Sequence, residues 1–158
     1  MDPQLKNRDR KLALSQRNQP LFWKAFGDEP DRRADIIYVA PTVRAVESAA
    51  YAFGMENVTI VIDPRLKDHK DKFVKANFKA SISALTNEGY LYPHLASRMM
   101  DDYDAMQAMS KGKNLESDVL GSNSDRISSF FGELLKRPEK RVVIVAHQNM
   151  IQYAGGYV

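Results

Sequence analysis

The chain contains no cysteine among its 158 residues, which excludes a thiolate nucleophile, a disulfide framework and a zinc-thiolate site. It also lacks any apolar stretch near the ~18 residues that a membrane-spanning helix needs. The first 17 residues are polar and do not form the apolar run of a secretory signal. We therefore expect a cytoplasmic protein. Because no internal repeat or low-complexity linker divides the chain, we expect a single domain over residues 1–158.

Neither positively nor negatively charged residues are in large excess. The chain has 23 basic and 20 acidic residues, for a net charge of +3, and the basic residues are spread along its length. This distribution does not indicate nucleic-acid binding. Hydrophobic residues make up 44% and charged residues 27%, as in ordinary globular proteins. A folded domain with a substantial core is therefore expected.

Three short apolar runs, residues 35–40, 58–62 and 142–146, predict strands that are buried on both faces. Between the first two, residues 42–53 carry apolar side chains at helical spacing, and Gly54 is placed to end that helix in a left-handed conformation. A strand, a helix and a second strand in this order form a βαβ unit. The pattern therefore predicts a parallel sheet.

Further helices are predicted around this unit. Residues 124–136 have a helical apolar pattern with Ser124 as the N-cap, residues 94–109 contain a helix, and residues 5–25 form two short helices. Four methionines fall in or near the second of these helices: Met99, Met100, Met106 and Met109. They are interpreted as gap-filling core residues, with a recognition surface as the alternative.

Three segments carry motif-like patterns. Residues 38–49 read Tyr-Val-Ala-Pro-Thr-Val-Arg-Ala-Val-Glu-Ser-Ala, residues 137–147 form a basic stretch and an apolar strand that ends at His147, and residues 2–11 begin Asp-Pro-Gln-Leu-Lys. In their order along the chain (2–11, 38–49, 137–147) they resemble motifs of the histidine phosphatase (phosphoglycerate mutase-like) superfamily, particularly its fungal members. Residues 38–49 are similar to Ser-Pro-x-x-Arg-Ala-x-x-Thr-Ala, residues 137–147 to the strand before a His-Gly motif, and residues 2–11 to Asp-x-x-Leu-Thr-x-x-Gly.

The resemblance implies an α/β fold with three layers, α/β/α, around a short, mainly parallel sheet. It also implies that Arg44 and His147 bind phosphate, because they occupy the positions of the family's phosphoryl-binding arginine and second histidine. For Arg44 the alternative is a solvated cation in a first helical turn, which is an unfavourable position with respect to the helix dipole. For His147 the alternative is a strand-end histidine bonded to backbone, and Gln148 replaces the usual glycine.

The sequence differs from the family at the positions of its catalytic residues. Phosphoryl transfer in the family uses the histidine of an Arg-His-Gly motif, and none of His69, His94 and His147 has that context. The family's acid would fall near Lys67, so Asp68 is at best a displaced substitute. Loss of a nucleophile can cost about 10^6 in turnover. We therefore interpret Arg44, Asp68 and His147 as vestigial. We expect a pseudoenzyme without cofactor or metal. His69 lies in a run of charged residues that we expect to be solvated.

The resemblance also has a consequence for the sheet. The family places the strand that ends at His147 between the strand before Thr42 and the Arg-His-Gly strand. The sequence begins after that strand and stops before the family's last strands, so we expect a truncated fold with Val142–Val145 as an edge strand. Such an edge needs covering by the N-terminal segment, by residues 154–158, by a second copy or by another protein.

The leading hypothesis is an inactive histidine phosphatase-like domain reused as a protein-interaction or structural assembly module. In this hypothesis the Val142–Val145 edge binds a protein partner or a second copy of the chain. Two alternatives use Arg44 and His147 instead. One is a weak phosphomonoesterase, and the other is a module that binds phosphate-containing ligands without turnover.

Overall fold

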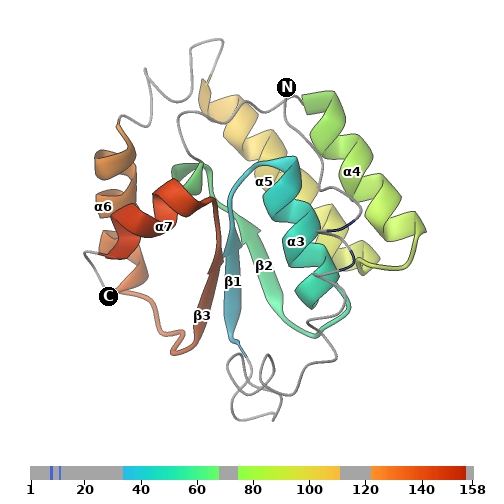
Figure 1. Cartoon of the computed structure of the whole chain (residues 1–158), viewed down its shortest axis with the longest axis horizontal. Coiled ribbons are helices and arrows are strands. Elements are labelled where there is room, and N and C mark those ends of the chain that lie inside the picture. The colour runs from blue at the N-terminus through green and yellow to red at the C-terminus, as the bar shows by residue number, and fades with distance from the viewer. Residues whose placement is uncertain (1–7, 9–10, 12–33, 68–74, 111–121, 156–158) are drawn as a thin grey trace.

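The structure, a computed structural model, describes residues 8, 11, 34–67, 75–110 and 122–155. Figure 1 shows a central sheet with helices around it. The two helices predicted within residues 5–25 lie outside the described residues, apart from Arg8 and Lys11. Within the described ranges, every helix is either too short or too polar to span a bilayer.

The sheet has three parallel strands in its described part. β1 (Ile36–Val39) lies in the centre, with β2 (Thr59–Ile62) on one side and β3 (Val142–Val145) on the other. All four residues of β1 are buried, as expected for a strand with helices over both faces. The three predicted strands and their parallel arrangement are thus confirmed. The predicted burial on both faces holds for β1 only, because alternate residues of β2 and all four residues of β3 are partly exposed.

The crossover from β1 to β2 is made by α3 (Val43–Phe53), which confirms the predicted βαβ unit. Its ending differs from the prediction, because Gly54 has φ −63° and lies in the right-handed region. Glycine is needed there for space: a Cβ at Gly54 would lie 2.1 Å from the carbonyl oxygen of Tyr90 and 2.5 Å from that of Ala50. The close approach of two backbone segments, and not a left-handed turn, therefore explains this glycine.

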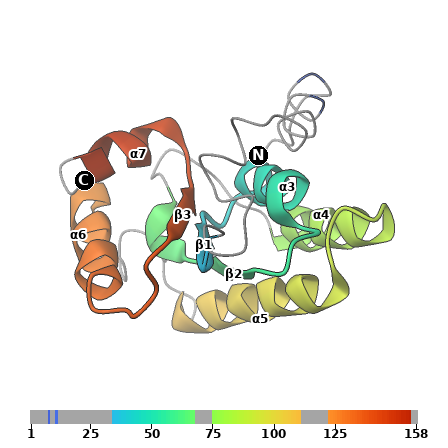
Figure 2. The ribbon, with the colours of Figure 1, turned by 90° about the horizontal axis from the view of Figure 1, so that it is seen from below.

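Helices cover both faces of the sheet (Figure 2). α3 lies on one face, and α5 (Pro93–Ser110) and α6 (Asn123–Leu134) lie on the other. α4 (Lys75–Asn87) packs against α3 and α5 on the β2 side of the molecule. The predicted three-layer α/β/α arrangement is confirmed.

Three elements were not predicted from the sequence: α4, the short 3-10 helix η1 (Pro64–Leu66) and α7 (Gln148–Ala154). The start of α6 is also corrected. Its N-cap is Ser122 and not Ser124, because the Ser122 hydroxyl accepts a hydrogen bond from the Asp125 amide at 3.2 Å. The Asp125 carboxylate accepts in return from the Ser122 amide, which completes a capping box.

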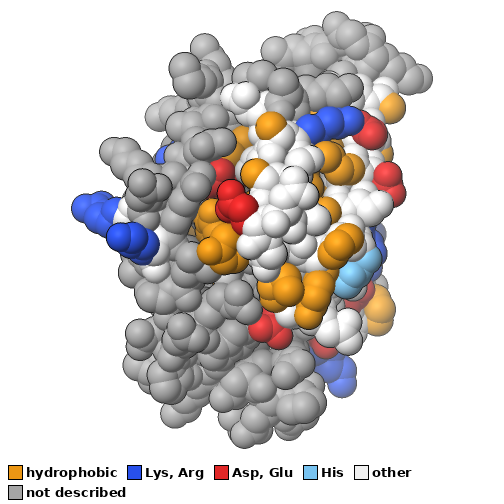
Figure 3. All heavy atoms as spheres, turned by 90° about the vertical axis from the view of Figure 1, so that its right-hand side faces the viewer, with side chains coloured by type: hydrophobic (Ala, Val, Ile, Leu, Met, Phe, Trp, Pro, Cys, Tyr) orange, Lys and Arg blue, Asp and Glu red, His pale blue; other side chains and the backbone are white. Residues whose placement is uncertain are grey.

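The methionines of α5 differ in their environments. Met99 and Met106 are 0% and 2% exposed and belong to the core, which confirms the core interpretation for these two residues. Met109 is 50% exposed. Figure 3 views the molecule from the side on which α4 lies, and its hydrophobic side chains are interspersed with polar groups and with charges of both signs.

Candidate functional site

A hydrogen bond joins the carboxyl ends of β1 and β3. Thr42 follows β1 and His147 follows β3, and the Thr42 Oγ1 lies 2.7 Å from the His147 Nε2. Each residue is also the N-cap of the next helix: the carbonyl of Thr42 accepts from the Val46 amide at 3.0 Å, and that of His147 from the Ile151 amide at 3.1 Å. The ends of adjacent parallel strands are where open α/β sheets bind ligands.

The Thr42 and His147 side chains do not cap their own helices, because neither forms a side-chain cap hydrogen bond. Their contact uses Nε2 as either donor or acceptor, depending on the imidazole tautomer. In both cases this nitrogen is already hydrogen-bonded. It would have to leave Thr42 before it could attack a phosphorus atom.

Arg44 lies in the first turn of α3, two residues after Thr42 and at the same end of the sheet as His147. It is half-buried, and the first turn carries no acidic side chain. The amino end of a helix has a partial positive charge, to which the Arg44 guanidinium adds. The structure thus places Arg44 and His147 at the same end of the sheet, and phosphate binding by these two residues stays a prediction.

The other predicted residues do not join this group. Asp68 and His69 lie outside the described residues. His94 lies at the opposite, amino end of the strands, where it lines an open cavity together with Asp35 and Thr59 and stacks on Tyr92 at 5.5 Å. Across the described ranges, no three His, Asp or Glu side chains gather in a way that could hold a metal ion.

β3 is an edge strand in the described part of the sheet. The carbonyls of Arg141 and Val145 accept from the amides of Asp35 and Ala40 at 2.8 and 2.9 Å, so these carbonyls face β1. Because successive peptide groups of a strand alternate in direction, the amides and carbonyls of Val142 and Ile144 point away from β1. All four residues of β3 are only partly buried, in contrast to β1.

An apolar cavity of about 420 Å³ adjoins this edge. Its wall on the β3 side is formed by Val142 and Ile144, and its opposite walls are formed by α6 and α7. Ile151 of α7 also lines the cavity and is 53% exposed. The cavity was not predicted from the sequence, because no helix was predicted after His147. The available signal was the apolar pair Met150 and Ile151, one turn after a strand end.

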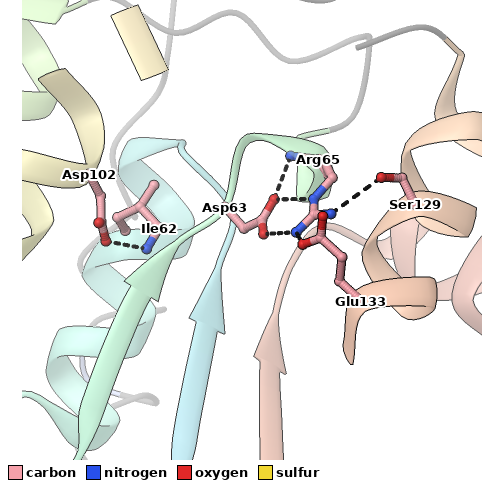
Figure 4. Close-up of polar contacts among 6 residues, drawn as sticks. All are labelled: Ile62, Asp63, Arg65, Asp102, Ser129 and Glu133. Atoms are coloured by element: carbon pink, nitrogen blue, oxygen red, sulfur yellow. Dashed lines mark hydrogen bonds and ion pairs between the residues drawn. The ribbon is translucent and has the colours of Figure 1, made fainter. Parts of the chain in front are cut away.

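A second polar group lies at the end of β2 and was also missed (Figure 4). The Asp63 carboxylate accepts hydrogen bonds from the Arg65 Nε at 3.0 Å and Nη2 at 2.7 Å. Arg65 Nη2 also lies 2.9 Å from Glu133 of α6. The hydrogen bond to Asp63, above all, raises the pKa of Arg65 above its ordinary value. These contacts fasten α6 to the end of β2.

Comparison with known proteins supports the fold. No family model matches the chain, and no curated protein matches it. The structure is similar to the crystal structure of "a putative alpha-ribazole-5'-P phosphatase" from Escherichia coli K-12, with a TM-score of 0.51 and 14% sequence identity. The match covers 97% of this chain but 66% of the other, so the chain spans about two thirds of that protein's length. The fold of this chain is therefore histidine phosphatase-like, as the sequence motifs predicted.

Proposed function

We propose that this chain is a histidine phosphatase-like domain that acts by assembly and not by turnover, and that two copies associate through their β3 edges. The observation that carries the proposal is that β3 presents the amides and carbonyls of Val142 and Ile144 away from β1, on a strand that is only partly buried. Uncovered edge strands of this kind pair readily with another strand.

The composition of β3 favours a second copy as the occupant. The strand reads Val-Val-Ile-Val and carries no charge that would repel an identical strand. Two copies related by a two-fold axis would pair their β3 strands antiparallel and extend the sheet across the interface. Each copy would then satisfy the outward backbone groups of the other. The apolar cavity beside Ile144 supplies adjoining hydrophobic surface.

The arrangement of His147 supports the absence of turnover. The 158 residues contain no Arg-His-Gly sequence, and Nε2 of His147, the described histidine at the carboxyl end of the sheet, is hydrogen-bonded to Thr42. Because the phosphohistidine route needs an in-line nitrogen nucleophile, Arg44 and His147 alone can hold an anion but are poorly arranged to accept a phosphoryl group.

The test is the oligomeric state of the purified 158-residue chain, measured by sedimentation velocity over the widest concentration range that solubility allows. Wild type is expected to form a reversible dimer. Ile144→Pro is expected to be monomeric, because proline removes the outward amide of residue 144 while the amides that face β1 remain. Ile144→Ala is the matched control: it shortens the side chain, keeps the amide and should still dimerise.

A wild-type chain that stays monomeric at every concentration would contradict the proposal. So would a dimer that persists unchanged in a folded Ile144→Pro variant. Circular dichroism of each variant confirms that it is folded before its mass is interpreted.

A second candidate function, binding of a phosphate-containing ligand, is favoured by the Thr42–His147 contact beside the first turn of α3. It predicts that phosphate raises the thermal unfolding temperature of wild type and has little effect on Arg44→Gln. Weak phosphomonoesterase activity is the catalytic form of this alternative. It would be supported by p-nitrophenyl phosphate hydrolysis that disappears in His147→Ala, and excluded by equal rates in both proteins.

A further inference from the structure

A polar cavity of about 430 Å³ lies between α5 and α6, over the middle of the sheet. Its floor includes Tyr38 of β1 and Val61 of β2, and its walls include Arg98 of α5 and Lys136, just after α6. The cavity is separate from the Thr42–His147 group, which lies beyond the ends of the strands. Its volume is within the range of small-molecule sites.

The Tyr38 hydroxyl is the most informative group in this cavity. Tyr38 is 5% exposed, and its ring packs edge-on against Phe130 at 5.1 Å. Yet within the described residues its hydroxyl forms no hydrogen bond, although the side chain lines the cavity. The hydroxyl oxygen itself is not one of the buried side-chain atoms that lack a partner in the described part of the chain, so it is reached from the cavity although the ring is buried. This hydroxyl is therefore placed to bond a molecule in the cavity.

The charges around the cavity favour an anion. Of its four cationic side chains, Arg65 is neutralised by Asp63 and Glu133 (Figure 4), and Arg137 pairs with Glu139 at 2.7 Å. The remaining two, Arg98 and Lys136, have no ion pair with any described residue. Both side chains are exposed, and the charge of Arg98 is partly offset by Asp102, so the cavity combines a modest excess of positive charge with a neutral donor. Burial raises the pKa of Tyr38, which keeps its hydroxyl protonated at neutral pH.

We propose that this cavity binds a small organic oxyanion, with the Tyr38 hydroxyl donating to an anionic oxygen and with Arg98 and Lys136 supplying the opposite charge. The chemical class is a phosphate ester or a carboxylate, because both offer an anionic acceptor of the right size. Tyr38 and Phe130 both line the cavity, although Phe130 is 1% exposed and the Arg65 guanidinium lies over its ring. Anions that carry an aromatic ring therefore serve as probes of both the polar and the apolar parts of the lining.

The experiment compares phenyl phosphate with benzoate as probes, and sodium chloride at matched ionic strength as the control. Binding is measured by isothermal titration calorimetry and by the rise in thermal unfolding temperature. At least one of the two organic anions is expected to bind wild type and to raise its unfolding temperature above the chloride control. Comparing the affinities of phenyl phosphate and benzoate shows whether the cavity prefers a phosphate or a carboxylate group.

Tyr38→Phe is the decisive variant because it removes only the hydroxyl. Affinity should fall by about tenfold or more, since a hydrogen bond to a charged group is lost. The unfolding temperature without ligand should be unchanged or slightly higher, because no described residue bonds that hydroxyl. Arg98→Gln combined with Lys136→Gln should also weaken binding, whereas Lys140→Gln, a cation outside the cavity, should not.

Three results would overturn the inference. One is the absence of binding by both organic anions, and another is equal affinity in wild type and Tyr38→Phe. The third is binding that is lost in Arg44→Gln but kept in Tyr38→Phe, which would place the anion at the carboxyl end of the sheet instead. Because these results concern ligand affinity, they are independent of whether the chain dimerises through β3.

Discussion

The two outer strands of the sheet are held in different ways. On the β2 side, Ile60 and Ile62 are buried, α5 packs along the strand, and the outward amide of Ile62 donates to the Asp102 carboxylate at 2.9 Å (Figure 4). On the β3 side, all four residues are half-buried, and Val142 and Ile144 direct their backbone groups away from the sheet. Among the described residues, a helix of the chain closes the β2 edge, and no strand pairs with the β3 edge. This difference is the basis of the proposal that assembly uses the β3 edge.

The largest expected effect comes from the same truncation made in each outer strand. Ile60→Ala in β2 should lower the free energy of unfolding by about 2–5 kcal/mol, because Ile60 is fully buried. Ile144→Ala should cost less than half as much, because Ile144 is only partly buried and faces a cavity. Urea denaturation at a concentration where the chain is monomeric measures both. Equal losses would remove the proposed distinction between the two edges.

An intermediate effect is expected where β2 meets α5. Asp102→Ala deprives the Ile62 amide of its acceptor and should cost about 1–3 kcal/mol. Asp102→Asn keeps an acceptor oxygen and removes a charge that burial disfavours, so it should cost less or even stabilise. Urea denaturation of the two variants shows whether Asp102→Ala loses more stability than Asp102→Asn. If both cost the same, the hydrogen bond to Ile62 does not matter for closing this edge.

The pH dependence of this pair gives a further check. Burial raises the pKa of Asp102, despite the opposing hydrogen bond from Ile62. The folded state therefore holds the proton more tightly than the unfolded state, and stability contributed by Asp102 is fully present below its unfolded pKa and is lost as pH rises through its folded pKa. The stability of wild type relative to Asp102→Asn should accordingly fall with rising pH in that interval. A rise would contradict the assignment.

The smallest effect is expected at the surface of the closed side. Lys79 of α4 and Asp104 of α5 form an ion pair at 3.1 Å, and both side chains are more than a third exposed. Asp104→Asn should change the free energy of unfolding by about 0.2–1 kcal/mol at most, and less in high salt. A larger loss in denaturation would mean that this pair, and not the buried contacts of β2, holds the α4–α5 layer in place.

The sheet was predictable because its strands are continuous apolar runs. Residues 35–40, 58–62 and 142–146 each contain a strand where expected, and the helix between the first two fixes their parallel direction. The place of β3 beside β1 followed from the resemblance to histidine phosphatases and is confirmed. Local patterns were therefore sufficient wherever one continuous apolar run forms one strand.

Elements whose buried positions are partly polar were not predictable. In α4, Ser81 is buried and donates to the Glu47 carboxylate of α3 at 3.2 Å, so the apolar spacing of this helix is interrupted. The cavities were hidden for another reason. Tyr38 and Phe130 are far apart in sequence and meet only when α6 packs on the sheet. The contact of Thr42 with His147 likewise depends on the order of the strands.

Amide hydrogen exchange as a function of protein concentration compares the two edges in a single sample. At low concentration the Ile144 amide should exchange quickly and the Ile62 amide slowly. At high concentration the account predicts that Ile144 becomes protected while Ile62 hardly changes. Fast exchange of Ile144 at all concentrations would show that no strand pairs there, and full protection at the lowest concentration would show that the chain covers this edge itself.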